Sequence, residues 1–190
     1  MKPLFTIHAG EYLVGLHVPK YLKALKPNVW IPAKDTGIDL LVTDSSNQHA
    51  VSLQVKYGKD FLPEMKKPDL RRSLRCRSWF TLNRTKLNKS QAQFWVFVLR
   101  GFESDAPDFV VIPKTELQQR MKGKHTSERG TLQIYLCSTK EKKNRCWEMR
   151  DIRREAERQI AEGTYKDPVR DFTKYLNEAG WAAIADRLKR

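Results

Sequence analysis

Two predicted strands carry the side chains best suited to chemistry in this sequence. Their apolar patterns span residues 38–43 and 50–57, and a polar turn separates them. Side chains alternate between the two faces of a strand, so Gln54 and Lys56 share one face of the second strand. Asp39 interrupts the apolar run of the first strand. An acid, an amide and an ammonium group are therefore expected side by side on rigid elements.

These groups match the needs of metal-assisted phosphodiester hydrolysis. That reaction requires oxygen ligands for a hard cation and a group that orients or deprotonates the attacking water. Asp39 can supply a carboxylate, Gln54 an amide oxygen and Val55 a main-chain carbonyl. Lys56 could hold the water and offset charge on the phosphate, and Glu11, on a preceding helix, could add a carboxylate. Two structural interpretations stay open: Lys56 as an exposed strand lysine and Glu11 as an ordinary surface acid.

The pattern resembles the PD-(D/E)XK nuclease superfamily. It is most similar to the branch with a Q-X-K motif, which includes Mrr-like restriction enzymes and relatives of Holliday-junction resolvases. Three segments carry the resemblance: 9–14 (AGEYLV), 37–42 (GIDLLV) and 52–56 (SLQVK). The resemblance covers roughly residues 5–115. Ile38 stands where the superfamily has its proline.

The resemblance implies a metal site and a catalytic lysine. Glu11, Asp39, Gln54 and the main chain of Val55 would bind Mg²⁺, with Mn²⁺ as an alternative ion, and Lys56 would be the catalytic lysine. Most of the superfamily has Glu or Asp at the position of Gln54, so this site has one negative charge fewer. Two functions follow: a Mg²⁺-dependent DNA endonuclease of the restriction, repair or junction-resolving type, or a weak or inactive nucleic-acid-binding module that kept the fold.

The charge balance independently points to a polyanionic partner. Lysine and arginine number 36 against 22 aspartate and glutamate, which gives a net charge of +14. Such a surplus favours nucleic acid, here DNA, with a structural RNA-binding protein as a further alternative. The basic stretch 66–89 is expected to be a loop or short strands, and Trp79 within it either stacks on a base or lies in the core. Its predicted phosphate contacts, which could also be a solvated surface, are Arg71, Arg72, Arg75, Arg77, Lys86 and Lys89.

Other classes of protein are disfavoured. No stretch approaches the roughly 18 apolar residues of a membrane helix, so no membrane association is expected. The first residues lack the long apolar segment of a signal peptide. The three cysteines have no CxxC spacing, which argues against a disulfide framework or a zinc site and favours a cytoplasmic location.

The rest of the chain predicts an α/β fold. Helices are expected at residues 5–26 (with Pro19 kinking or splitting the first), 115–121, 151–162 and 168–188, and further strands at 29–32, 92–99, 108–112 and 131–137. This order predicts a central mixed sheet flanked by helices. The resemblance implies a restriction-endonuclease-like core of the type αβββαβ, with extra C-terminal helices.

Two units are expected along the chain. Residues 1–148 would form the nuclease-like domain, and residues 149–190 a helical extension packed on that domain or on a partner subunit. Cutting both strands of a duplex usually needs two active sites, so a homodimer is expected.

Overall fold

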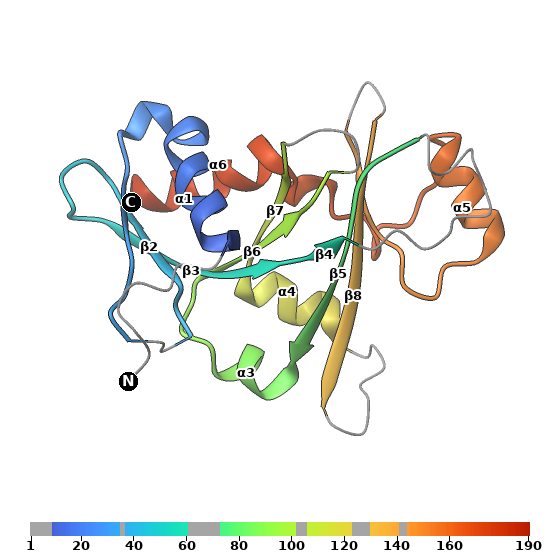
Figure 1. Cartoon of the computed structure of the whole chain (residues 1–190), viewed down its shortest axis with the longest axis horizontal. Helices are drawn as coiled ribbons and strands as arrows, with labels where there is room; N and C mark the ends of the chain where they lie inside the picture. Colours follow the sequence, from blue (N-terminus) through green and yellow to red (C-terminus); the bar gives the residue numbers. More distant parts are fainter. Residues whose placement is uncertain (1–8, 35–36, 61–72, 102–105, 123–129, 141–143) are drawn as a thin grey trace.

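Two β-sheets form the centre of the molecule, and helices cover their outer faces (Figure 1). The computed structural model describes residues 9–34, 37–60, 73–101, 106–122, 130–140 and 144–190. This arrangement confirms the α/β class and a mixed central sheet, and it adds a second sheet that was not predicted.

The mixed sheet, sheet A, has the strand order β1-β2-β3-β6-β7. Strands β3 and β6 are parallel, and the other neighbours are antiparallel. The strands of sheet A are β1 (Asn28–Trp30), β2 (Leu40–Thr43), β3 (Ala50–Tyr57), β6 (Phe94–Leu99) and β7 (Asp108–Pro113). Every residue of β6 is buried, as its continuous apolar run predicts for a strand covered on both faces.

The second sheet, sheet B, is antiparallel and has the order β4-β5-β8-β9. Its strands are β4 (Lys59–Asp60), β5 (Leu74–Asn83), β8 (Thr131–Thr139) and β9 (Cys146–Glu148). The stretch 66–89 was predicted as a loop or short strands, and its described part is instead one strand of ten residues, β5, followed by a short helix. Cys76, Ser78 and Phe80 point into the core, while the arginines between them are only partly buried.

The helices surround the sheets. They are α1 (Ala9–Tyr21), the 3-10 turn η1 (Lys23–Leu25), α3 (Arg84–Lys89), α4 (Lys114–Met121), α5 (Arg154–Ala161), the 3-10 turn η2 (Thr173–Tyr175) and α6 (Asn177–Leu188). Pro19 lies inside α1, near its end, and only the short turn η1 follows. The helix predicted at 168–188 begins only at Asn177, so Phe172 is buried from a turn and not from a helical face.

Sheet A separates two apolar clusters. On one face, Val14 of α1 and Trp181 of α6 pack against Val51, Leu53 and other aliphatic strand residues. On the other face sheet A packs against sheet B, where the rings of Phe97 and Phe80 meet edge to face with centroids 4.9 Å apart. Sheet A is therefore a middle layer, with α1 and α6 on one side and sheet B, α3 and α4 on the other.

No helix among the described residues is long and apolar enough to cross a bilayer.

Candidate functional site

Strand β3 extends beyond its antiparallel neighbour β2. The register between them ends at Leu40 opposite Leu53, although the Asp39 N–H still donates to the Leu53 carbonyl at 2.8 Å. The last residues of β3, including Gln54 and Lys56, therefore have no paired β2 residue beside them. A gap in sheet A opens where the predicted chemical groups lie.

Asp39 reaches into this gap and bonds to β3. Its Oδ2 accepts a hydrogen bond from the Val55 N–H at 2.6 Å and another from the Gln54 side-chain amide. Gln54 is 8% exposed, so the pair lies at the floor of the gap. The prediction that Asp39 and Gln54 lie side by side on adjacent strands agrees with this geometry.

The main chain of Val55 faces the same gap. The N–H and C=O groups of a strand residue point toward the same neighbouring strand. Because the Val55 N–H donates to Asp39, its carbonyl also points to the side where β2 has ended. A carboxylate, an amide and a carbonyl thus share one opening.

Helix α1 brings Glu11 to the same place. A Cβ on Gly10 would lie 2.8 Å from the Cβ of Tyr57 and 3.3 Å from a methyl of Val55, so only glycine allows this close approach to β3. Glu11 is partly buried in the first turn of α1 and lines the same pocket as Asp39.

Lys56 lies on the Gln54 face of β3, as strand alternation predicts. Its Nζ is 5.6 Å from the centre of the Trp95 ring, over the ring face. Trp95 is the register partner of Gln54 on the parallel strand β6 and is 3% exposed. The indole therefore forms an apolar floor beneath the ammonium group, an arrangement favoured by the ring quadrupole.

All of these groups line one pocket of about 1030 Å³. Its opposite wall comes from the end of β5, the helix α3 and the start of β8. The lining residues are Ala9, Gly10, Glu11, Gly37, Asp39, Gln54, Val55, Lys56, Tyr57, Thr81, Leu82, Asn83, Thr85, Lys86, Lys89, Ser90, Trp95 and Thr131. The pocket therefore lies between sheet A and the end of sheet B.

Two of the predicted basic residues, Lys86 and Lys89, line this pocket and are exposed. The side chain of Asn83 caps α3 by accepting a hydrogen bond from the Lys86 N–H at 2.9 Å, which fixes the start of the helix that carries both lysines. A positive wall thus faces the carboxylates across the pocket.

The arginines predicted to contact phosphates do not line this pocket in the part of the chain that the structure describes. Arg75 lies 3.4 Å from the buried carboxylate of Asp108, and Arg77 pairs in register with Cys137 in sheet B. Neither lines the pocket. Arg71 and Arg72 lie outside the described residues. Trp79, the other residue singled out in this stretch, is partly buried and stacks on Tyr135 with centroids 5.9 Å apart.

The oxygen groups of the pocket suit a hard cation such as Mg²⁺. Within the described ranges no three His, Cys, Asp or Glu side chains are grouped to hold a metal, so a cation here would depend on amide and carbonyl oxygens as well. The Gln54 amide nitrogen faces Asp39, and its Oε1 lies 3.7 Å from where a Cβ on Gly37 would be. Gly37 has φ of +81°, which favours glycine. A half-turn of the amide would aim its oxygen at a cation beside Asp39.

Sequence reasoning missed most of the opposite wall. Thr81 and Asn83 alternate at the end of β5, and Thr85 follows in α3. The alternation of polar and apolar residues at 81–83 was the sequence signal for a strand there, but the arginines earlier in the stretch suggested a loop or short strands instead. Trp95 was predicted only as part of a buried strand, because its position beneath Lys56 depends on the pairing of β3 with β6.

No family model matches the chain, and comparisons with curated proteins and with solved structures found no match either. The case for a function therefore depends on the pocket itself.

Proposed function

We propose that the protein is a Mg²⁺-dependent DNA endonuclease that hydrolyses phosphodiester bonds at this pocket. The observation that carries the proposal is the meeting of four residues around one opening: Glu11 from α1, Asp39 from the segment just before β2, and Gln54 and Lys56 from β3. Two lysines on the facing wall and the net charge of +14 supply attraction for a phosphate backbone. A structural surface would have no need to gather these groups in one cavity.

Each residue has a distinct part in the proposed reaction. Asp39, Gln54 and the Val55 carbonyl would hold the ion, with Glu11 as a further oxygen donor. When bound, the ion supplies positive charge that offsets the charge developing on the phosphate. Lys56 orients the attacking water and stabilises the same developing charge, with its ammonium held over Trp95.

The phosphates on either side of the scissile bond need separate contacts. Lys86 and Lys89, exposed on α3, neutralise them from the facing wall and hold the strand in register. The substrate would thus lie between the wall that carries Lys56 and the proposed metal ligands and the wall that carries Lys86 and Lys89.

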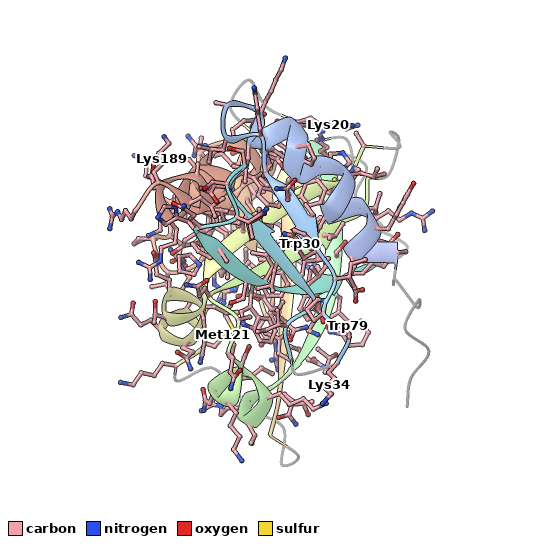
Figure 2. The ribbon with its side chains drawn as sticks, turned by 90° about the vertical axis from the view of Figure 1, so that its left-hand side faces the viewer. Lys20, Trp30, Lys34, Trp79, Met121 and Lys189 are labelled. Carbon is pink, nitrogen blue, oxygen red and sulfur yellow. The ribbon has the colours of Figure 1, made fainter. Side chains whose placement is uncertain are left out.

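The test is cleavage of circular DNA, both as plasmid and as a single strand, with Mg²⁺ or Mn²⁺. Lys56→Ala is expected to lower the rate by about a hundredfold or more, because it removes charge stabilisation at the reacting group. The matched control is Lys20→Ala, an exposed lysine at the far end of α1 from Glu11 (Figure 2). Cleavage by wild type and Lys20→Ala but not by Lys56→Ala supports the proposal. Equal cleavage by all three contradicts the assigned site.

One observation favours the alternative, a nucleic-acid-binding module without activity. The Gln54 amide and the Val55 N–H both donate to one oxygen of Asp39, so this oxygen has partners without a metal ion. An ionised carboxylate at position 54 could not donate such a hydrogen bond. DNA binding by wild type without cleavage in either ion would support this alternative.

A further inference from the structure

We infer that the pocket takes an unpaired DNA strand, with a base stacked on Tyr57, and not an intact duplex. The inference deepens the proposed function and rests on it for the identity of the polymer. The pocket has a buried floor, an aromatic ring at its edge and a polar facing wall.

The floor of the pocket is buried, while Glu11, Asp39 and Lys56 are partly exposed along its wall. Gln54 is 8% exposed and Trp95, the floor beneath Lys56, is 3% exposed. The cavity of about 1030 Å³ is at the upper end of the size that encloses one small ligand, so it holds only a few nucleotides. Walls from β3 and from β5 enclose it on both sides. A phosphate must enter between these walls, which a single strand can do.

Tyr57 offers a stacking surface on the α1 side of the pocket, on the opposite face of β3 from Gln54 and Lys56. It is the last residue of β3, follows Lys56 directly, lines the pocket and is 41% exposed. The tight contact of Gly10 with its Cβ fixes the start of the side chain. An exposed aromatic ring next to a phosphate site is the usual platform for an unpaired base, because every base has a π face.

The facing wall suits exposed base edges. Thr81 and Thr85 are exposed there, and their hydroxyl groups both donate and accept hydrogen bonds. Base edges that a duplex keeps in Watson–Crick pairs are free in an unpaired strand. The wall thus provides neutral polar groups next to the lysines that would bind phosphate.

The experiment measures binding, so that it does not depend on cleavage. A labelled single-stranded oligonucleotide and a blunt duplex of the same sequence are titrated with protein, with Ca²⁺ replacing Mg²⁺. The wild type is expected to bind the single strand at least about tenfold more tightly. Tyr57→Phe, which keeps the ring, should bind within about twofold of wild type. Tyr57→Leu, which keeps an apolar side chain against α1, should weaken single-strand binding roughly fivefold or more.

Trp30→Leu is the matched control. Trp30 is 51% exposed on the edge strand β1, outside the pocket, and Figure 2 shows it on the face turned to the viewer. Equal affinity for duplex and single strand, wild-type binding by Tyr57→Leu, or an equal loss in Trp30→Leu would each overturn the inference. Single-strand preference without cleavage would uphold it while the endonuclease proposal fails. Cleavage of duplex DNA that Tyr57→Leu leaves unchanged would support the endonuclease proposal and overturn the inference.

Discussion

Gln54 determines how much negative charge lies beside Asp39 at the floor of the pocket. Its amide donates to Asp39 at the floor of the pocket, where an ionised glutamate would repel that carboxylate. The native residue therefore places a neutral hydrogen-bond donor, and not a second acid, beside Asp39. A carboxylate in its place would make the site depend on the ion.

Gln54→Glu tests this balance. Without metal the variant should lose about 1–3 kcal/mol of unfolding free energy, because a buried hydrogen bond is replaced by two adjacent acids. Added Mg²⁺ should then raise its melting temperature more than that of wild type, because the extra carboxylate strengthens ion binding to the folded state. Thermal melts with and without Mg²⁺ measure both effects.

Gln119→Glu, at an exposed position on α4, is the control and should respond to Mg²⁺ like wild type. If Mg²⁺ shifts wild type, Gln54→Glu and the control equally, no ion binds beside Gln54.

At this scale the sequence was informative, because strand alternation alone predicts which side chains share a face. It predicted that Gln54 and Lys56 point the same way, and they line one pocket. The partners of these residues from distant parts of the chain, such as Trp95 and Thr81, could not be predicted, since no local pattern encodes which strands pair.

Among the elements, the turn that joins β2 and β3 fixes the register of Asp39 with Gln54. Within it, the Asp44 carboxylate accepts hydrogen bonds from the Ser46 hydroxyl at 2.6 Å, the Gln48 N–H at 2.9 Å and the His49 N–H at 3.2 Å. These bonds, that from Ser46 foremost, lower the pKa of Asp44 from 3.8 to about 2. The turn therefore favours the ionised acid.

The depressed pKa predicts a definite dependence on acid. The ionised form contributes stability above pH 3.8, the ordinary value, and this contribution is lost as the pH falls toward about 2. Asp44→Asn cannot titrate, so the difference in melting temperature between wild type and variant should shrink across this window. Melting curves at a series of pH values measure it.

Asp186→Asn, exposed on α6, is the matched control for removing one carboxylate. A difference between wild type and Asp44→Asn that stays constant from pH 6 to pH 2 would contradict the assigned role of the turn.

The elements were predicted well where their apolar pattern was clean and poorly where charge or turns interrupted it. The continuous run of β6 left no ambiguity. In β5, Arg75 and Arg77 led to the prediction of a loop or short strands, although Cys76 between them is buried. The apolar spacing of Phe172 with later residues resembled a helical face, but the chain turns twice before α6 begins.

Over the whole molecule, one buried carboxylate joins both sheets and the last helix. Asp108, at the start of β7, accepts hydrogen bonds from Ser138 of β8 at 2.5 Å and from Asn177 of α6 at 2.8 Å. The guanidinium of Arg75 on β5 lies 3.4 Å away. These contacts tie the C-terminal helix to the same body as the sheets.

Asp108→Ala should therefore destabilise the whole fold, by about 2–4 kcal/mol, because it leaves a partly buried guanidinium and two buried polar groups without their acceptor. Asp108→Asn keeps an acceptor and should lose less. Urea unfolding followed by tryptophan fluorescence and by far-UV circular dichroism measures both. A loss under about 1 kcal/mol in Asp108→Ala would show that the network adds little.

The arrangement of the two sheets was beyond sequence reasoning. Contacts such as Phe80 against Phe97 join strands of different sheets, and neither residue signals its partner. Composition and strand order give a central sheet with helices, but the second sheet and the pocket between the sheets arise only from packing.

The parallel pairing of β3 with β6 has a consequence for how this protein could diversify. Parallel neighbours require a crossover, and here the crossover contains β5 and α3. The groups proposed to react lie before it in the chain, and most of the facing wall lies within it. Substitutions at the exposed pocket positions of this segment would therefore change the wall proposed to bind the substrate and leave the residues proposed to react unchanged.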